Sequence, residues 1–246
     1  MFTVENLTER DIAKAIDHSL LRPELADQFV EDGCRLAAEY HVASVCVRPA
    51  DVQRARAILD GTDVAVGTVI GFPHGNHLTA TKVFEARQAL ADGATELDMV
   101  IQIGALKSGR DAEVLADIAA IVEIAHDSGA IVKVIFENAY LTDDEKVRAC
   151  HLCEAAGADF VKTSTGFAPG GATHDDLRLM RANTAPHIQV KAAGGVRTLD
   201  ALLEVMALGT TRIGATATKT IIDDFRARKA GRSADVPTPV TRESGH

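Results

Sequence analysis

The chain reads FVKTSTGF at residues 160–167 and VKAAGGVR at residues 190–197, and the pattern that these two stretches share decides the fold. Each stretch is an apolar run with a lysine near its end, and each continues into a loop that contains glycine. A segment of helical periodicity follows, after Thr173 in one case and after Thr198 in the other. Short apolar strands that alternate with amphipathic helices are typical of repeated βα units and a mostly parallel sheet.

The same alternation extends over nearly the whole chain. Strands are predicted at eight β-branched runs, residues 15–19, 43–47, 64–70, 96–101, 131–136, 159–163, 188–192 and 211–214. Helices are predicted between and after them at residues 26–40, 50–59, 80–92, 112–128, 143–156, 174–181, 199–208 and 217–228. Eight βα units in 246 residues predict an α/β protein with the (β/α)8 or TIM-barrel fold.

The two ends of the chain carry less regular signals. Residues 8–13 begin with a cap-like Thr8 and predict an extra N-terminal helix over one end of the barrel. No linker interrupts residues 1–229, which we expect to form a single domain. Residues 230–246 contain Gly, Ser, Pro237 and Pro239 but almost no core residues, and this composition predicts a flexible C-terminal tail.

Composition limits the classes of partner. The chain has 46% hydrophobic and 25% charged residues, as soluble globular proteins do, and a net charge of −9. This charge argues against nucleic acid or an anionic membrane as the main partner, because both attract a basic surface. We find no signal peptide and no apolar run of membrane-spanning length, and the four cysteines are too few and too irregular for a disulfide framework. We therefore expect a cytoplasmic protein.

Charged residues in the apolar runs are the first candidates for chemistry, because the pocket of a parallel barrel lies at the carboxyl ends of its strands. Four such residues stand out: Asp98, Lys133, Lys162 and Lys191. Lys133 comes early in its run, so we expect it deeper in the barrel or at its base. For any one of them a buried ion pair, such as Asp98 with Lys162, is a sufficient explanation. Three together at strand ends favour function.

A pair of lysines has a particular chemical use. An ordinary lysine has a pKa of about 10.4 and is almost entirely charged at neutral pH, so it is a poor nucleophile. A second ammonium about 4 Å away would lower that pKa by roughly 3 units through repulsion. The sequence therefore predicts that a neutral lysine attacks a carbonyl group, and Lys191 is the candidate for the second cation.

Glycine-rich loops suggest a place for an anion. Gly194 and Gly195 follow the seventh predicted strand and Gly214 ends the eighth, where many barrels bind phosphate through backbone N–H groups. Gly170 and Gly171 could add to the rim. Tight turns between strands and helices explain Gly170 and Gly171 equally well, and Gly194 and Gly195 less well.

Two other spacings are weaker signals for a metal. His74 and His77 have an H-x-x-H spacing, but no carboxylate or third histidine lies near them in sequence, so we interpret their segment as a structural loop. Cys150 and Cys153 form a single pair in a predicted helix, and one pair cannot complete a tetrahedral zinc site. We expect no metal site.

At the level of motifs the chain resembles the deoxyribose-phosphate aldolases, a family of class I aldolases. The resemblance runs over nearly the whole chain and rests on DHSLL (17–21), VCV (45–47), GFP (71–73), ELDMV (96–100), VKTSTG (161–166), KAAGGVR (191–197) and RIG (212–214). It implies a barrel, commonly dimeric and without metal or organic cofactor, that cleaves 2-deoxy-D-ribose 5-phosphate to D-glyceraldehyde 3-phosphate and acetaldehyde in deoxyribose catabolism.

The resemblance also implies roles for single residues. Lys162 would form the Schiff base, Lys191 would lower its pKa and assist proton transfer, and Asp98 would act as acid and base through water. The residues implied beside the imine and around the phosphate are Ser164, Thr165, Gly166, Gly194, Gly195, Gly214 and Thr216.

Several positions depart from the family's common pattern; Arg48, Gln102 and Asn138 are expected at the pocket rim, and Thr216 and Ala217 in the loop that would bind the phosphate. Ala217 leaves one hydroxyl fewer for a phosphate. A C-terminal tyrosine is also missing, since Tyr40 and Tyr140 are the only two. These departures leave open a related class I aldolase with another or an unphosphorylated acceptor aldehyde. A metal-dependent class II aldolase and a non-catalytic barrel that binds sugar phosphate also stay open.

Overall fold

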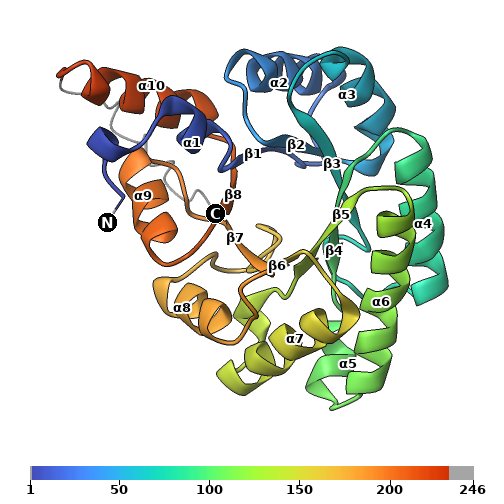
Figure 1. The fold of residues 1–246 in the computed structure, drawn as a ribbon. Helices are drawn as coiled ribbons and strands as arrows, with labels where there is room; N and C mark the ends of the chain where they lie inside the picture. The colour runs from blue at the N-terminus through green and yellow to red at the C-terminus, as the bar shows by residue number, and fades with distance from the viewer. Residues whose placement is uncertain (1, 233–246) are drawn as a thin grey trace, which may run out of the picture.

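Short β-branched runs form eight parallel strands that close into a barrel, with helices around the outside (Figure 1). The computed structural model describes residues 2–232. The strands are β1 (Ile16–Leu20), β2 (Ser44–Val47), β3 (Ala65–Ile70), β4 (Glu96–Val100), β5 (Ile131–Ile135), β6 (Phe160–Lys162), β7 (Gln189–Ala193) and β8 (Arg212–Ala215). Each predicted run overlaps one strand in the predicted order, with ends that differ by one residue or a few, and the predicted fold class is confirmed.

The register of the sheet sets which charged side chains meet. Each strand pairs with the next along the chain, and β8 returns to pair with β1. Asp98 on β4 is in register with Lys133 on β5, and Lys162 on β6 is in register with Lys191 on β7. Registered neighbours in a parallel pair lie on the same face of the sheet. The buried Asp98 carboxylate contacts all three lysines from different strands, so this face is the interior of the barrel.

The outer layer of helices follows the expected order. It consists of α2 (Asp27–Glu39), α3 (Val52–Leu59), α4 (Thr79–Ala91), α6 (Asp111–Asp127), α7 (Asp143–Ala156), α8 (His174–Ala182), α9 (Leu199–Ala207) and α10 (Thr218–Lys229). In α6 the residues Val114, Ile118, Ile121 and Ala125 are fully buried, so one apolar face packs on the sheet.

Local signals explain where several helices begin and end. The side chains of Thr142, Thr173 and Thr198 each accept a hydrogen bond from a backbone N–H of the helix that follows. Gly157 ends α7 with a left-handed φ of 76°. The helix α5 (Ile103–Lys107) was not predicted, because five residues are too short to show a helical period. Short 3-10 helices at η1 (Val4–Asn6), η2 (Pro49–Asp51) and η3 (Asn138–Tyr140) complete the elements.

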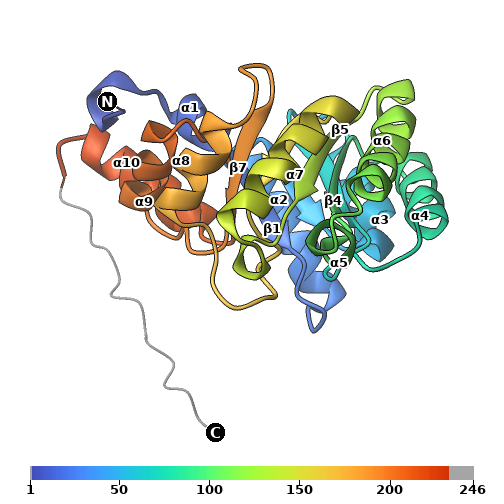
Figure 2. The ribbon, with the colours of Figure 1, turned by 90° about the horizontal axis from the view of Figure 1, so that it is seen from below.

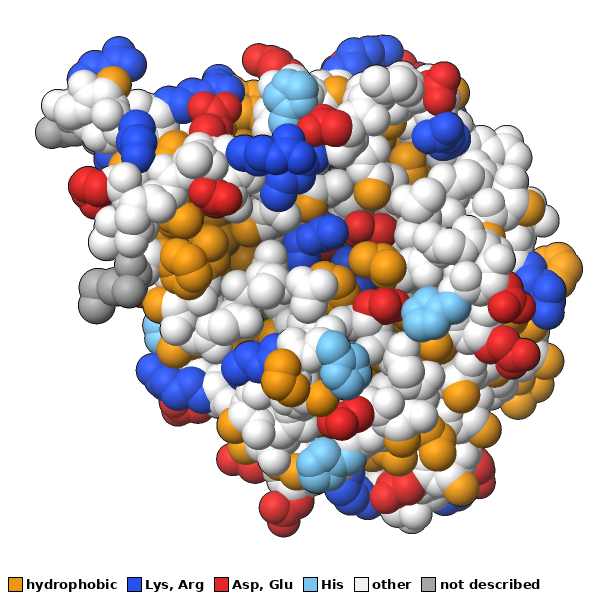
Figure 3. Space-filling model, in the orientation of Figure 1, with side chains coloured by type: hydrophobic (Ala, Val, Ile, Leu, Met, Phe, Trp, Pro, Cys, Tyr) orange, Lys and Arg blue, Asp and Glu red, His pale blue; other side chains and the backbone are white. Residues whose placement is uncertain are grey.

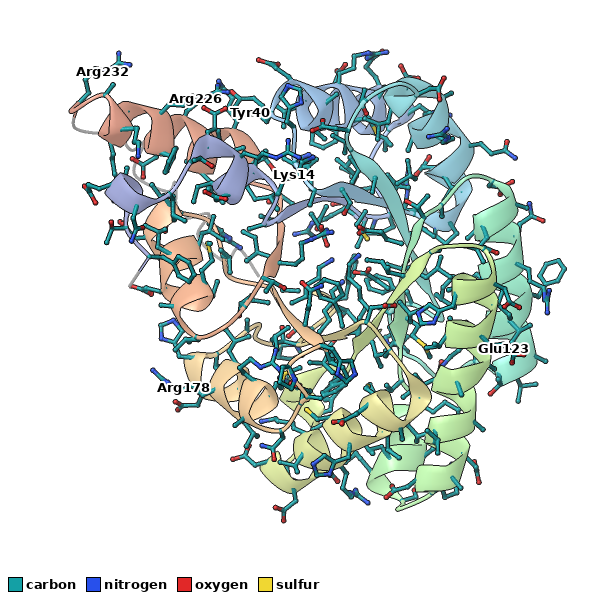
Figure 4. The ribbon with its side chains drawn as sticks, in the orientation of Figure 1. Lys14, Tyr40, Glu123, Arg178, Arg226 and Arg232 are labelled. Atoms are coloured by element: carbon teal, nitrogen blue, oxygen red, sulfur yellow. The ribbon has the colours of Figure 1, made fainter. Side chains whose placement is uncertain are left out.

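The extra helix α1 (Glu9–Ala13) packs against α10 at one end of the barrel, and Figure 2 shows it on the side opposite the loop between β6 and α8. Arg226 of α10 binds the Glu9 carboxylate through two nitrogens and lies 4.9 Å from the centre of the Tyr40 ring (Figure 4). The Ala13 carbonyl accepts a hydrogen bond from Ala43 N, just before β2, so α1 lies at the amino ends of the strands.

Beyond α10 the structure describes only residues 230–232, so residues 233–246 of the predicted tail lie outside the described range. Of the helices formed by residues 2–232, none combines the length and the apolar composition that crossing a bilayer requires.

Candidate active site

A cavity of about 230 Å3 opens at the carboxyl ends of the strands, between the loops that follow β1, β6, β7 and β8. Its wall contains seven of the residues predicted for the site, namely Lys162, Thr165, Gly166, Gly194, Gly195, Gly214 and Thr216. Ser164, Asp98 and Lys191 do not line the cavity; all three are buried next to it or beneath it. Lys162 is thus the member of the predicted catalytic set that reaches the cavity wall.

Three strands bring the predicted catalytic residues into direct contact. Asp98 Oδ2 accepts a hydrogen bond from Lys162 Nζ at 2.7 Å and another from Lys191 Nζ at 2.8 Å. Side-chain exposure is 0% for Asp98, 4% for Lys162 and 1% for Lys191. The two ammonium groups therefore share one carboxylate oxygen in a nearly dry interior.

Burial and charge together determine the protonation of Lys162. Burial lowers its pKa, because the charged ammonium loses solvation, and the positive charge of Lys191 lowers the pKa further. The negative charge of Asp98 opposes both effects, but the net pKa of Lys162 is below the ordinary lysine value. Repulsion between the lysines was expected to be the main cause, whereas burial comes first.

Lys191 remains charged for a reason that the sequence did not reveal. Its Nζ lies 2.5 Å from Asp17 Oδ2 on β1, in addition to its bond to Asp98. Burial disfavours its charged form, but the two carboxylates raise the pKa of Lys191 above the ordinary value. Asp17 is fully buried and was not predicted as a site residue, because it lies early in its strand, away from the expected pocket.

The deeper position expected for Lys133 agrees with the structure. Its Nζ donates to Asp98 Oδ1 at 2.9 Å and to Glu96 Oε2 at 2.6 Å, below the level of Lys162. Burial disfavours the charged form, yet the carboxylates around it raise the pKa of Lys133 well above its usual range. Lys133 thus remains charged and fixes the second oxygen of Asp98.

Glycines shape the rim of the cavity that faces the loops after β6 and β7. Gly194 has a φ of 82°, and a Cβ there would lie 2.9 Å from the Cα of Gly171. A side chain at either position would push the two loops apart. Gly170 and Gly171 themselves do not line the cavity; Gly170 has a left-handed φ of 87°, as in a tight turn, and Gly171 lies too close to Gly194 to carry a side chain.

Two arginines at the rim were missed by the sequence analysis. Arg22, on the loop after β1, and Arg197, on the loop after β7, both line the cavity and are exposed. Loop residues have no periodicity that indicates where their side chains point, so the pattern of the strands could not identify them. Both could approach an anion that rests on the nearby glycine backbone.

Thr165 is held in place by a buried carboxylate. Glu137, with a left-handed φ of 57°, accepts hydrogen bonds from the backbone N–H and from the hydroxyl of Thr165. The Thr165 Oγ1 in turn accepts a hydrogen bond from Phe167 N at 3.0 Å. A non-glycine residue in this conformation costs of order 1–3 kcal/mol, so surrounding contacts must hold the loop in a defined shape.

Three of the positions that depart from the family's pattern lie away from the cavity, whereas Thr216 lines it. Within the described range, Arg48, Gln102 and Asn138 do not line the cavity. Arg48 binds Asp51 at 2.6 Å and the carbonyls of Pro23 and Leu25, so it supports the loop that carries Arg22. Gln102 donates a hydrogen bond to Thr79 Oγ1, and Asn138 donates one to the Met180 sulfur. The expectation that these three positions touch the pocket rim is therefore wrong, because none of the three lines the cavity.

Neither spacing that suggested a metal forms a cluster. In residues 2–232, no group of three or more His, Cys, Asp or Glu side chains is arranged to hold a metal ion. Cys150 and Cys153 are fully buried free thiols in α7. Burial raises the pKa of Cys150 to about 12, so this thiol is protonated and packs as a small apolar side chain.

Fold and site together define a (β/α)8 enzyme that presents a buried amine to a cavity, as class I aldolases do. Residues 11–222 match the family model described as DeoC/LacD family aldolase. The chain belongs to the DeoC/LacD family of aldolases and is accordingly a lyase.

Relatives cover almost the whole chain. A deoxyribose-phosphate aldolase from Rhodopirellula baltica is 48% identical over 236 residues, which are 96% of this chain and 97% of that protein. One from Alkaliphilus oremlandii is 50% identical over 221 residues, 90% of this chain and 99% of the relative. The tetrameric deoxyribose phosphate aldolase from Aeropyrum pernix superposes with a TM-score of 0.84 at 29% identity, covering 92% of this chain and 95% of the other.

Proposed function

We propose that this protein is a deoxyribose-phosphate aldolase that reversibly cleaves 2-deoxy-D-ribose 5-phosphate to D-glyceraldehyde 3-phosphate and acetaldehyde. Relatives of this name are 48% and 50% identical over nearly their full length. The observation that carries the mechanism is the Lys162 amine at the cavity wall, with its pKa lowered and its Nζ 2.7 Å from Asp98.

The proposed reaction uses Lys162 as the nucleophile. Its neutral amine attacks C1 of the open-chain sugar, and loss of water gives a protonated imine. The bond between C2 and C3 breaks, its electron pair moves toward the imine nitrogen, and the C3 hydroxyl loses its proton as glyceraldehyde 3-phosphate forms. Protonation of the resulting enamine at C2 and addition of water release acetaldehyde and regenerate Lys162.

Asp98 and Lys191 are the proposed proton carriers. Asp98 is bonded to both lysines, so a proton that leaves one of them can pass to the other through a single oxygen. Several cations around it hold the pKa of Asp98 well below its usual range despite burial, so the carboxylate stays ionised and can accept hydrogen bonds from both lysines while a proton moves between them. Ser164 and Thr165 follow Lys162 in the chain and are proposed to border the imine.

The phosphate is proposed to rest on backbone N–H groups of the glycine loops. Gly166, Gly194, Gly195, Gly214 and Thr216 line the same cavity as Lys162. Arg22 and Arg197 would add positive charge there. This charge would compensate for the hydroxyl group that is missing at Ala217. A substrate phosphate would then lie across the cavity from the reacting amine.

Trapping and turnover test the proposal together. Acetaldehyde with borohydride should leave a reduced two-carbon adduct on Lys162, found by peptide mass mapping, and Lys162→Met should remove it. Lys107→Met, a change at an exposed lysine, should leave labelling intact.

The enzyme should turn over deoxyribose 5-phosphate much faster than deoxyribose. Labelling at another lysine would contradict the Schiff-base assignment, equal turnover would favour an unphosphorylated substrate, and binding without trapping would indicate a non-catalytic barrel.

A homodimer in the reducing cytoplasm is also proposed, with residues 1–229 as one catalytic domain. The family resemblance supports the dimer, and four buried cysteines without a disulfide support a reducing setting. Sedimentation equilibrium should give twice the chain mass. A tetramer, as in the Aeropyrum pernix relative, would contradict the dimer.

A further inference from the structure

Seven charged side chains form one continuous cluster inside the barrel, and the proposed reaction uses three of them. We call them the barrel charge cluster; its members are Asp17, Glu96, Asp98, Lys133, Lys162, Lys191 and Arg212. Their side-chain exposure ranges from 0% for Asp17 and Asp98 to 16% for Arg212. The cluster runs from the cavity toward the amino ends of the strands.

Contacts link all members of the cluster. Asp98 joins Lys162, Lys191 and Lys133 on the cavity side. Asp17 joins Lys191 to Arg212, which is also 3.0 Å from Glu96. A change of charge at one end is therefore transmitted through a chain of direct ion pairs to the other end.

The charges of the cluster do not balance when every member is ionised. It holds four basic and three acidic side chains, which leaves one positive charge without a counterion. An uncompensated charge in a buried, weakly polarisable environment is costly. Loss of one proton from one lysine restores neutrality.

Lys162 is the lysine from which that proton is most easily lost. Among the described residues its one ion-pair partner is Asp98, through an oxygen that Lys191 also uses. Lys191 contacts two carboxylates and Lys133 contacts three. The pKa directions follow the same order, because the pKa of Lys162 is lowered while those of Lys133 and Lys191 are raised.

Arg212 supplies the fourth positive charge from the end of the barrel opposite the cavity. It is the first residue of β8, and its guanidinium binds Asp17 and Glu96 and lies 5.8 Å from the centre of the Phe160 ring. Figure 3 shows basic and acidic side chains gathered in a hollow at the centre of the face that carries α1 in Figure 1. A guanidinium does not lose its proton in proteins, so this charge is permanent.

We propose that Arg212 sets the charge balance of the barrel charge cluster and thereby makes Lys162 the lysine that loses its proton and acts as a neutral amine. Arg212 is a positioning residue, since it touches no reacting atom and acts through Asp17, Glu96 and the lysines. Without its charge, three lysines and three carboxylates would balance with Lys162 fully protonated. This inference rests on the proposed function, in which neutral Lys162 is the nucleophile.

Other titratable groups near Lys162 do not share this role. The groups that act on Lys162 electrostatically are Asp98 from β4, Lys191 from β7 and Cys46 from β2. Burial raises the pKa of Cys46 to about 11, so this thiol is neutral through the physiological range. Arg212 is faced by Asp17 from β1, Glu96 from β4 and the charge of Lys133 from β5.

The test follows imine formation as a function of pH. The initial rate of acetaldehyde trapping on Lys162 by cyanoborohydride is measured from about pH 5 to pH 10, and the midpoint of its rise reports the proton loss of Lys162. Arg212→Met removes the positive charge and should raise the midpoint by on the order of one pH unit. Arg212→Lys is the matched control, which keeps the charge and should keep the midpoint.

A second change at the same end predicts the opposite sign. Glu96→Gln removes a negative charge, increases the positive excess of the cluster and should lower the midpoint. The double change Arg212→Met with Glu96→Gln should return it close to wild type. A purely structural role for Arg212 predicts slower trapping in these variants without midpoints that move in opposite directions.

The outcomes separate the inference from the proposed function. If wild-type Lys162 is not labelled at any pH, the proposed function itself fails. If it is labelled and neither single variant moves the midpoint, or both move it in the same direction, the role of Arg212 is overturned alone. Should Arg212→Met not fold by circular dichroism, Glu96→Gln decides, since an unmoved or raised midpoint there contradicts the inference.

Discussion

A single oxygen of Asp98 serves two ammonium groups, and this sharing makes the lysines unequal. Lys191 has Asp17 as a second partner, whereas Lys162 relies on the shared oxygen alone within the described residues. The asymmetry keeps Lys191 charged and allows Lys162 to lose its proton more easily. The roles proposed for the two lysines follow from which carboxylates they touch and not from their similar positions on neighbouring strands.

Replacement of Lys191 by Met should shift the activity of the enzyme to higher pH. The variant loses the positive charge that lowers the pKa of Lys162, so more of this amine stays protonated at neutral pH. We expect at least about a tenfold loss of kcat near pH 7 with partial recovery at alkaline pH, as for a pKa rise of about one unit. The measurement is a pH–rate profile with Lys191→Arg as the control that retains the charge. An unchanged profile for Lys191→Met would exclude this role.

His18 should make the stability of the protein depend on pH. Burial lowers its pKa to about 4 from 6.5, and its Nδ1 lies 2.8 Å from Thr218 Oγ1. Between these pH values the unfolded chain binds a proton that the folded chain does not. The stabilisation is therefore complete above about pH 6.5 and is lost as pH falls toward 4, by about 3 kcal/mol for this group.

A His18→Gln variant tests that assignment, because glutamine keeps a polar partner for Thr218 but does not titrate. Urea unfolding at pH 7 and near pH 4 gives the free energy of unfolding for both proteins. The variant should lose less stability on acidification than wild type, since all other groups cancel in the difference. Parallel losses in the two proteins would show that His18 does not carry this dependence.

The sequence indicated Lys162, Lys191 and Asp98, because charged residues in apolar strand runs are unusual. It did not indicate Asp17 or Arg212, which lie early in their strands at the end away from the cavity. Their importance depends on side chains that meet across the barrel, and no linear spacing encodes that meeting.

Helices α4 and α6 are joined by an ion pair that no solvent reaches. Lys82 Nζ lies 2.6 Å from Asp117 Oδ2, with both side chains 0% exposed, and it also donates to the Val100 carbonyl at the end of β4. Thr79 Oγ1 donates to the other oxygen of Asp117. The pair therefore fixes two helices to the strand that carries Asp98.

Breaking this pair on one side should destabilise the protein strongly. Lys82→Met leaves a buried carboxylate without its cation, which costs roughly 3–5 kcal/mol. The double variant Lys82→Met with Asp117→Leu removes both charges and should be more stable than the single variant. Denaturant unfolding measures the three free energies, and a double variant less stable than Lys82→Met would contradict the argument.

Elements were more predictable than their contacts. The eight strands followed from β-branched runs and the caps at Thr142, Thr173 and Thr198 from their residue types, because both signals are local. The helix α5 was not predicted because it has only five residues. The ion pair between Lys82 and Asp117 joins residues on different helices. A single sequence holds no local signal for such a pair.

The described ends of the chain lie together at the amino end of the barrel. Lys229, in the last turn of α10, donates hydrogen bonds to the carbonyls of Val4, Glu5 and Leu7. The cavity lies at the opposite end, at the carboxyl ends of the strands. The contacts that hold the two described ends of the chain together and the catalytic cavity therefore lie on different faces of the molecule.

Loss of the Lys229 contacts should loosen the N-terminal segment without affecting catalysis. In a Lys229→Met variant three carbonyls lose a charged donor, so hydrogen exchange of residues 2–13 should accelerate at least several-fold. Exchange in β4 and β6 and the value of kcat should match wild type. Lys219→Met, a change at an exposed lysine of the same helix, is the control. A fall in kcat would show that the two faces are coupled.

The pairing of β1 with β8 also determines how the protein should behave when it is heated or concentrated. Within residues 2–232 every barrel strand has a neighbour on both sides, so the native sheet offers no free edge on which a second chain could add a strand. Such an edge arises only when the barrel opens. Aggregation should therefore depend on the rate at which the barrel opens. A ligand that holds the loops after β1 and β8 together should slow aggregation as effectively as it protects the active site.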